Sequence, residues 1–175
     1  MELGMVGLGR MGGNMAQRLL EGGHSIVAYD PGVEAVEAVE ALGARAGNSL
    51  EDLVSLLSPP RAVWSMVPSG SITEDTVSAL GDLLSPGDAI VDGGNSNYKD
   101  SVRRASELGK KGVTFLDAGT SGGIWGLTEG YSLMVGGEKE AFQRLEQVFQ
   151  TLAPGPDHGY GHVGPAGAGH CVKMV

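Results

Sequence analysis

The stretch Leu3–Gly12 reads LGMVGLGRMG, a short apolar run followed by glycines in the spacing Gly-x-Gly-x-x-Gly. A helical segment, Asn14–Leu20, comes next, which completes the order of strand, glycine turn and helix. Such a turn lets the backbone approach a pyrophosphate, and the positive N-terminus of the helix faces the phosphates. We therefore predict a dinucleotide-binding turn at the start of an α/β domain.

The glycines of this turn have separate expected roles. Gly7 permits the tight turn, Gly9 lets the pyrophosphate come close to the backbone, and Gly12 lets the helix pack on the strand. The predicted cofactor-binding residues of the turn are Gly7, Leu8, Gly9, Arg10, Met11 and Gly12.

Asp30 ends a second apolar segment, Ser25–Tyr29, about 20 residues after the turn, as the dinucleotide fingerprint requires. An acid there accepts hydrogen bonds from the ribose hydroxyls and repels a 2′-phosphate, so NAD is favoured over NADP. Two alternatives remain. In the first, Asp30 only begins a turn and caps the next helix, and it does not bind a ribose. In the second, Arg10 and Arg45 hold a 2′-phosphate, so the domain accepts NADP.

Composition places the chain among ordinary globular α/β domains. Its 175 residues are 41% apolar, enough for one domain with a real core. A net charge of −9 argues against nucleic acid or an anionic membrane surface as partner. The lone Cys171 forms no internal disulfide, and no Cys/His cluster has metal-ligand spacing, so we expect no metal. Without a signal peptide or membrane-length apolar run, the expected location is the cytoplasm.

The remaining chain alternates strand-like and helix-like segments. Strands are predicted at 25–29, 44–46, 62–67, 89–91, 113–116, 132–135 and 160–163, and helices at 33–42, 49–57, 72–80, 101–108 and 141–152. This alternation predicts a Rossmann-like, doubly wound, mostly parallel sheet with helices on both faces. Ligands then bind at the carboxyl ends of the strands.

Polar loops follow the fourth and fifth predicted strands. Val67 and Pro68 are expected along the riboses of the cofactor, although Pro-Ser-Gly at 68–70 is also a plain turn. Asn95, in the loop DGGNS at 92–96, offers an amide to a polyol, a carboxylate or the cofactor. The alternative is that Asn95 and Ser96 cap the following helix.

A third loop, DAGTSGGIWG at 117–126, is expected directly after a strand. The hydroxyls of Thr120 and Ser121 and the N–H groups of Gly122 and Gly123 form a small anion nest. Three such loops at one sheet edge predict a cleft for an oxygen-rich anionic substrate beside a dinucleotide.

The last stretch, GPAGAGHCVK at 164–173, is typical of a glycine-rich turn that opens a helix. Such a helix approaches a ligand closely, and Lys173 is expected to project from it into the cleft. The alternative for any single lysine is a solvated position on a helix surface.

These motifs together resemble the decarboxylating 6-phosphogluconate dehydrogenases, over essentially the whole chain. The glycine turn alone fits the wider β-hydroxyacid dehydrogenases, whereas DGGNS and GAGHxVK are more specific to the phosphogluconate branch. The loop at 119–126 with Asp30 looks like its short, NAD-preferring bacterial type.

This resemblance implies oxidation of the C3 hydroxyl of 6-phospho-D-gluconate and loss of C1 as CO2, yielding ribulose 5-phosphate. Lys173 is implied as the general base, which requires a pKa lowered by desolvation and neighbouring positive charge. Asn95, Ser121, Gly122 and Gly123 are implied as substrate ligands. The role of His170 stays open between the cleft and a loop carbonyl.

The resemblance also implies residues beyond this chain. Residues 1–163 are expected to form the NAD-binding domain, and 164–175 to begin a helix leading to an all-helical domain. That part would supply a histidine, an asparagine, a proton-donating glutamate, phosphate-binding cations and a homo-oligomer interface. We therefore expect the chain alone to turn over little or nothing.

Two other functions remain open. One is a 3-hydroxyisobutyrate-type β-hydroxyacid dehydrogenase, against which the loop DGGNS weighs. The other is a non-catalytic nucleotide-binding module, which would have no need of a base at Lys173.

Overall fold

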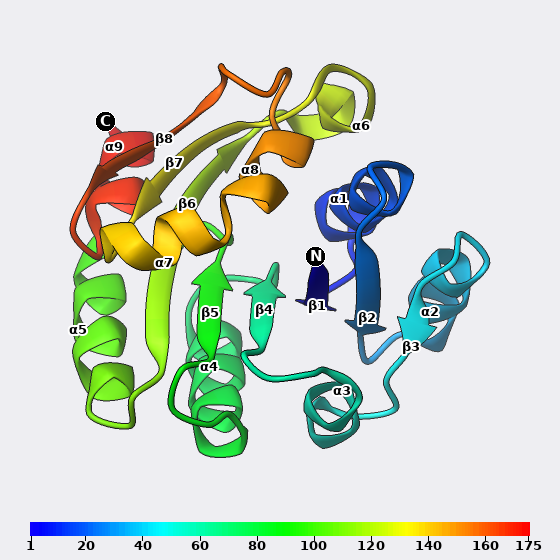
Figure 1. Ribbon diagram of the computed structural model, residues 1–175, viewed down its shortest axis with the longest axis horizontal. Helices are drawn as coiled ribbons and strands as arrows, with labels where there is room; N and C mark the ends of the chain where they lie inside the picture. The colour runs from blue at the N-terminus through cyan, green and yellow to red at the C-terminus, as the bar shows by residue number, and fades with distance from the viewer.

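The computed structural model describes residues 1–175, which form one eight-stranded sheet with helices on both faces (Figure 1). The strand order is β3-β2-β1-β4-β5-β6-β7-β8, and all neighbours are parallel except the pair β6/β7. The predicted Rossmann-like, mostly parallel α/β fold is confirmed. The order reverses between β1 and β4, which is the switch point where open α/β sheets bind ligands.

The strands are β1 (Glu2–Val6), β2 (Ser25–Tyr29), β3 (Arg45–Ala46), β4 (Ala62–Ser65), β5 (Ala89–Asp92), β6 (Thr114–Ser121), β7 (Ser132–Gly136) and β8 (Tyr160–Gly164). The helices are α1 (Arg10–Glu21), α2 (Val33–Glu40), α3 (Leu50–Leu56), α4 (Ser71–Leu83), α5 (Tyr98–Gly109), the 3-10 helix η1 (Gly123–Trp125), α6 (Gly126–Glu129), α7 (Lys139–Arg144), α8 (Glu146–Leu152) and α9 (Ala168–Met174). None of these helices has the length and apolar character needed to cross a bilayer.

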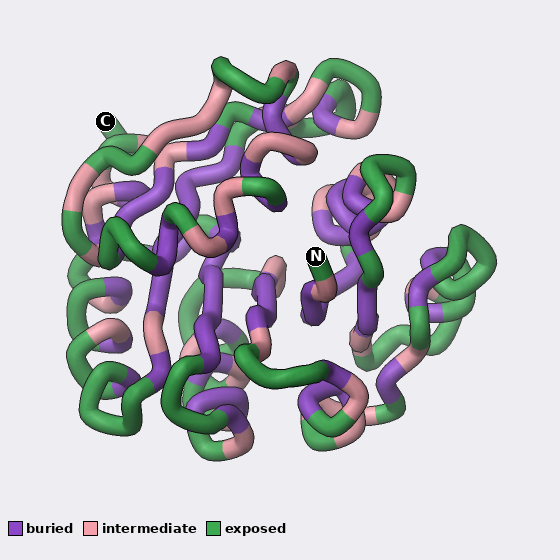
Figure 2. Tube along the Cα trace, viewed as in Figure 1, coloured by how far each residue is buried: buried purple, intermediate pink, exposed green.

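Each face of the sheet carries its own apolar core. On one face α1, α2, α7 and α8 cover side chains such as Met5, Trp64 and Phe149. On the other, α3, α4 and α5 cover a second cluster that includes Val63, Leu80 and Ile90. The central strands β1, β4, β5 and β6 are buried over most of their length, whereas the edge strands β3 and β8 have no buried residue (Figure 2).

Two predicted boundaries are wrong in an informative way. The strand expected at 113–116 continues to Ser121, because β6 pairs antiparallel with β7 as far as Ser121 opposite Ser132. Asp117, Ala118, Gly119 and Thr120 are therefore strand residues and not part of a loop. The helix α1 begins at Arg10, inside the glycine motif, and not at Asn14.

The single helix expected at 141–152 is two helices. The chain breaks at Leu145, whose φ and ψ are −100° and 7°. Leu145 is buried, and on either side of it Phe142 and Phe149 stack with ring centroids 5.2 Å apart. The break brings both rings into the same core, an arrangement that helical periodicity alone does not reveal.

Candidate functional site

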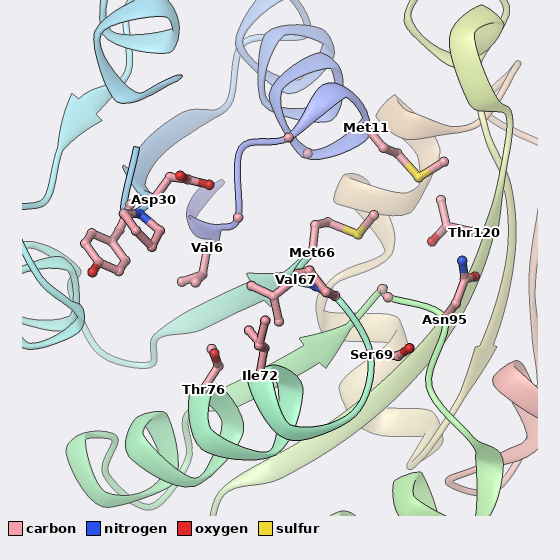
Figure 3. Close-up of a pocket in the computed structure, with 18 of the residues that line it drawn as sticks. Val6, Met11, Asp30, Met66, Val67, Ser69, Ile72, Thr76, Asn95 and Thr120 are labelled. Atoms are coloured by element: carbon pink, nitrogen blue, oxygen red, sulfur yellow. The ribbon is translucent and has the colours of Figure 1, made fainter. Parts of the chain in front are cut away.

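One large cleft, of about 1100 Å³, opens along the carboxyl ends of the parallel strands. Its volume is slightly above the range of about 300–1,000 Å³ that is typical of ligand sites. Figure 3 shows Asp30, Val6 and Thr76 toward one end and Met11, Thr120 and Asn95 toward the other.

The glycine turn after β1 has the geometry that its sequence predicts. Gly7 has φ of +90°, and a Cβ there would overlap the carbonyl oxygen of Met66. A Cβ at Gly12 would overlap the carbonyl oxygen of Gly7, so the helix packs directly on the turn. Nothing lies within 4 Å of a Cβ at Gly9, the N-cap of α1. The turn thus leaves open space in front of the helix N-terminus, where a pyrophosphate fits.

Asp30 is partly exposed at the end of β2, and its carboxylate is held by two backbone N–H groups. Leu8 N–H donates to Oδ2 at 2.7 Å and Gly32 N–H donates to Oδ1 at 2.7 Å. The second bond is an Asx turn, and the N-cap of α2 is Gly32 and not Asp30. A carboxylate accepts about four hydrogen bonds, so lone pairs remain for a ribose.

The wall opposite the glycine turn comes from the segment after β4 and the start of α4. Val67 and Pro68 line the cleft with Ile72, whose side chain is 51% exposed. The hydroxyl of Thr73 donates to the carbonyl oxygen of Pro68 at 2.8 Å and fixes this turn. An apolar wall facing a carboxylate suits a nucleoside, which has a flat base and a polar ribose.

A buried carboxylate organises the loop that carries Asn95. Asp92 is 0% exposed, and it accepts hydrogen bonds from Gly94 N–H at 3.0 Å and Ser96 Oγ–H at 2.6 Å. The guanidinium of Arg104 lies 3.8 Å from the same carboxylate. Asn95 itself stays exposed and lines the cleft, while the cap of α5 is Asn97. The alternative role of Asn95 and Ser96 as helix caps is therefore wrong.

The third polar group of the cleft lies at the turn from β6 into η1. Ser121, Gly122 and Gly123 line the cleft there, next to the buried Thr120. The ring of Tyr131 packs beneath Gly122, where an added Cβ would lie 2.7 Å from its Cδ1. Burial of this ring raises the pKa of the Tyr131 hydroxyl, which keeps it neutral under the turn.

Lys173 reaches the cleft from α9, which packs on β6 and β7. The side chain is half-buried, so the alternative of a solvated surface lysine is wrong. His170 on the same helix points away from the cleft: its Nδ1 shares a hydrogen bond of 2.7 Å with Ser101 Oγ, and the ring is 1% exposed.

Most of the predicted site residues line this one cleft: Gly7, Gly9, Met11, Gly12, Asp30, Val67, Pro68, Asn95, Ser121, Gly122, Gly123 and Lys173. Leu8 and Arg10 do not, since Leu8 is buried in the core and Arg10 faces solvent. Arg45 does not line it either. Prediction missed Ile72, Asp75 and Thr76, whose only sequence signal is their place in the first turns of the helix after Pro68.

The arrangement matches a known family of nucleotide-binding domains. Residues 2–167 match the NAD binding domain of 6-phosphogluconate dehydrogenase. The chain belongs to this family.

Relatives of the family extend well beyond the region that this domain covers. An NAD(+)-dependent, decarboxylating 6-phosphogluconate dehydrogenase of Haloferax volcanii is 46% identical over 100% of the chain, which spans 57% of that protein. A decarboxylating 6-phosphogluconate dehydrogenase of Haemophilus influenzae is 39% identical over 99% of the chain, here only 38% of the relative.

Solved structures share the fold closely. A Plasmodium falciparum 6-phosphogluconate dehydrogenase, solved in its apo form and in complex with NADP+ and with 6-phosphogluconate, superimposes with a TM-score of 0.91 at 28% identity; the match covers 99% of this chain and 39% of that one. A 3-hydroxyisobutyrate dehydrogenase of Mycobacterium tuberculosis gives a TM-score of 0.89 at 26% identity, over 99% of this chain and 57% of that one. The fold is therefore shared between enzymes with different named substrates.

Proposed function

We propose that this domain binds NAD together with the carboxylate and hydroxyl groups of 6-phospho-D-gluconate. In this role it takes part in the oxidative decarboxylation of that substrate to ribulose 5-phosphate and CO2. The observation that carries the proposal is the single cleft that joins the glycine turn and Asp30 to Asn95, Ser121 and Lys173.

The cofactor end of the cleft fits a dinucleotide. The N-terminus of α1, with open space at Gly9, supplies N–H groups and a positive dipole for a pyrophosphate. Asp30 is placed at the end of β2 for the adenosine ribose. When bound, the nicotinamide accepts the hydride that leaves C3 of the substrate.

The charges of the cleft favour NAD over NADP. Asp30 and Asp75 line it, and Lys173 is its one cationic lining residue. Carboxylates repel a 2′-phosphate, and no arginine lines the cleft to offset that repulsion. The relative from Haloferax volcanii is named NAD(+)-dependent, in agreement with this choice.

At the substrate end, Lys173 accepts the proton of the C3 hydroxyl as the hydride leaves. It returns a proton to the C3 oxygen as the bond from C2 to C1 breaks and CO2 departs. Asn95, Ser121 and the N–H groups of Gly122 and Gly123 surround this region and provide hydrogen bonds for hydroxyl and carboxylate oxygens. Placement of the base within reach of its proton is the geometric requirement for such a step.

We further propose, from the greater length of the relatives, that different parts of the protein bind the cofactor and complete the substrate site. Residues 1–163 form the NAD-binding domain, and residues 164–175 lead toward further chain that completes the substrate site and the homo-oligomer. By this account the protein works in the cytoplasmic pentose phosphate pathway, and this domain alone turns over little.

The likeness to a 3-hydroxyisobutyrate dehydrogenase makes that activity the second candidate. The two differ in substrate and share the base. Incubation of the protein with NAD+ and either 6-phosphogluconate or 3-hydroxyisobutyrate, followed by NADH absorbance and CO2 release, tests them. Slow formation of NADH and CO2 with 6-phosphogluconate only is the expected result.

NADH formation with 3-hydroxyisobutyrate only would replace the proposal with the second candidate. Where turnover is too slow to follow, saturation-transfer NMR with each substrate in the presence of NAD+ gives the same discrimination. Binding of NAD+ with neither substrate would favour a non-catalytic nucleotide-binding module.

A further inference from the structure

Two buried aspartates lie side by side on neighbouring strands near the cleft, Asp92 at the end of β5 and Asp117 within β6. Asp92 of β5 and Asp117 of β6 are register partners in a parallel pair, and each is 0% exposed. Side chains of register partners extend to the same face of a sheet. Asp92 holds the Asn95 loop, as described above, whereas Asp117 holds a helix.

Asp117 accepts hydrogen bonds from the first turn of α9. Its Oδ1 accepts from Gly167 N–H at 2.7 Å and its Oδ2 accepts from His170 N–H at 2.8 Å. The first N–H groups of a helix have no partner within the helix, and a carboxylate there is also favoured by the dipole. Lys173 lies one turn beyond His170 on the same helix, so this bond pair fixes its position along the helix axis.

Glycines fix the depth of the same helix. A Cβ at Gly119 of β6 would lie 2.7 Å from both the carbonyl oxygen of Gly169 and the Cβ of Lys173. A Cβ at Gly136 of β7 would lie 2.8 Å from the nitrogen of Gly169. The backbone of α9 therefore lies directly against the backbone of two strands.

A side-chain contact fixes the lateral position of α9. The ring of His170 shares its hydrogen bond with Ser101 of α5, on the side of the helix away from the cleft. The hydrogen bonds of Asp117, the glycine contacts and the Ser101 bond come from three elements, β6, β7 and α5, which hold α9 on different sides.

We propose that Asp117 is a positioning residue for Lys173: its carboxylate sets the helix N-terminus, and thereby the place of the amine in the cleft. The inference rests on the proposed function only in naming Lys173 as the base. Asp117 itself touches neither the cleft nor the reacting atoms.

Asp117→Asn tests the proposal, because asparagine keeps the shape and one acceptor oxygen but turns an NH2 toward one of the two N–H groups. In the full chain, amide exchange at Gly167 and His170 should accelerate about tenfold or more. The nuclear Overhauser contact between Gly119 Hα and Lys173 Hβ should weaken. In the NADH assay with 6-phosphogluconate, kcat should fall about tenfold or more, with KM for NAD+ within about twofold.

Asp88→Asn is the matched control. Asp88 is also buried and accepts from two backbone N–H groups, those of Arg61 at 2.6 Å and Ser85 at 2.9 Å, and it pairs with the Arg61 guanidinium at 3.3 Å. It lies just before β5, at the other edge of the sheet from the cleft. This variant should have a lower free energy of unfolding than the wild type, but the same amide exchange at Gly167 and the same kcat.

Unchanged exchange at Gly167 and His170 in a folded Asp117→Asn protein would overturn the proposal, as would equal effects in the Asp88→Asn control. If Asp117→Asn does not fold, Asp117→Glu, which keeps the charge but moves the carboxylate outward by one methylene, should weaken the contact between Gly119 and Lys173; an intact contact there also counts against the proposal. A wild-type protein that neither binds nor oxidises 6-phosphogluconate in the presence of NAD+ would refute the proposed function alone, since the exchange results do not depend on substrate.

Discussion

The two ends of the cleft hold their carboxylates in different ways. At the cofactor end Asp30 is partly exposed and bonds to the backbone of its own turn and of the glycine turn. At the substrate end Asp92 and Asp117 are fully buried, and Asp117 bonds to a helix 50 residues further along the chain. The cofactor end is thus a local structure on the rim of the sheet, while the substrate end is continuous with the core.

This contrast predicts that changes at the substrate end affect stability first and changes at the cofactor end affect binding first. Asp92→Asn should have the largest effect on folding, because it removes one of the two carboxylates beside the buried Arg104 guanidinium and weakens two loop bonds inside the core. We expect a loss of about 3 kcal/mol in the free energy of unfolding, measured in urea. Asp75→Asn, at an exposed acid of the same cleft, should change it by less than about 0.5 kcal/mol. Equal losses of stability in Asp92→Asn and Asp75→Asn would contradict the difference between buried and exposed carboxylates.

Two alanine variants separate folding from binding within the glycine turn. Gly7→Ala places a Cβ against the Met66 carbonyl at φ of +90° and should cost about 2 kcal/mol of stability, together with NAD binding. Gly9→Ala meets no protein atom within 4 Å, so its free energy of unfolding should change by less than about 1 kcal/mol. Calorimetry should nevertheless show at least about tenfold weaker NAD+ binding, because the methyl group occupies the space for the pyrophosphate. Normal NAD+ affinity in Gly9→Ala would mean that the cofactor lies elsewhere.

Asp30→Asn addresses cofactor choice. The amide keeps an acceptor for only one of the two backbone N–H groups, those of Leu8 and Gly32, and it loses the negative charge. NAD+ affinity should therefore fall about fivefold while NADP+ affinity rises or stays constant. Calorimetric titration of both cofactors measures the ratio. Equal weakening of both would show that Asp30 only shapes its turn.

The smallest expected effect lies outside the cleft, at Glu74 of α4. A hydrogen bond from Arg103 lowers the pKa of Glu74 to about 2, with a further contribution from Arg104. Because the pKa is lower in the folded than in the unfolded chain, the interaction stabilises the fold above about pH 4.5 and is lost as the pH falls toward 2. The pairs are solvent-exposed on the Arg103 side, so Glu74→Gln should cost only about 0.5–1 kcal/mol at pH 7.

Urea unfolding at pH 7 and pH 3, in low and high salt, measures this effect. The difference between the wild type and Glu74→Gln should shrink at the lower pH and at high salt. A difference that grows as the pH falls would contradict the assigned direction of the pKa.

The same contrast explains what the sequence predicts well. The fold, the glycine turn and Asp30 are predictable because their signals are local: Gly7 and Gly12 act within one turn, and Asp30 follows its strand directly. Asn95, Ser121 and Lys173 come from loops and helices far apart in sequence. Their common location is still predictable, because ligands of open α/β sheets bind at the carboxyl ends of the strands. Their roles as ligands and base remain predictions.

Other features depend on contacts that no local pattern encodes. The extension of β6 to Ser121 follows from pairing with β7, and the break at Leu145 follows from packing of Phe142 and Phe149. Arg10 has the motif position of a cofactor residue, but as the first residue of α1 it is exposed and does not line the cleft. The sequence pattern places Asp117 only at the start of a predicted loop, although in the structure its carboxylate holds the first turn of α9.

The central claim is that the cleft is an NAD site selected by Asp30, and calorimetric titration of the wild-type chain with NAD+ and then NADP+ tests it most directly. The account predicts binding of one NAD+ per chain, about tenfold or more tighter than NADP+. Binding of neither cofactor, or a preference for NADP+, would contradict it.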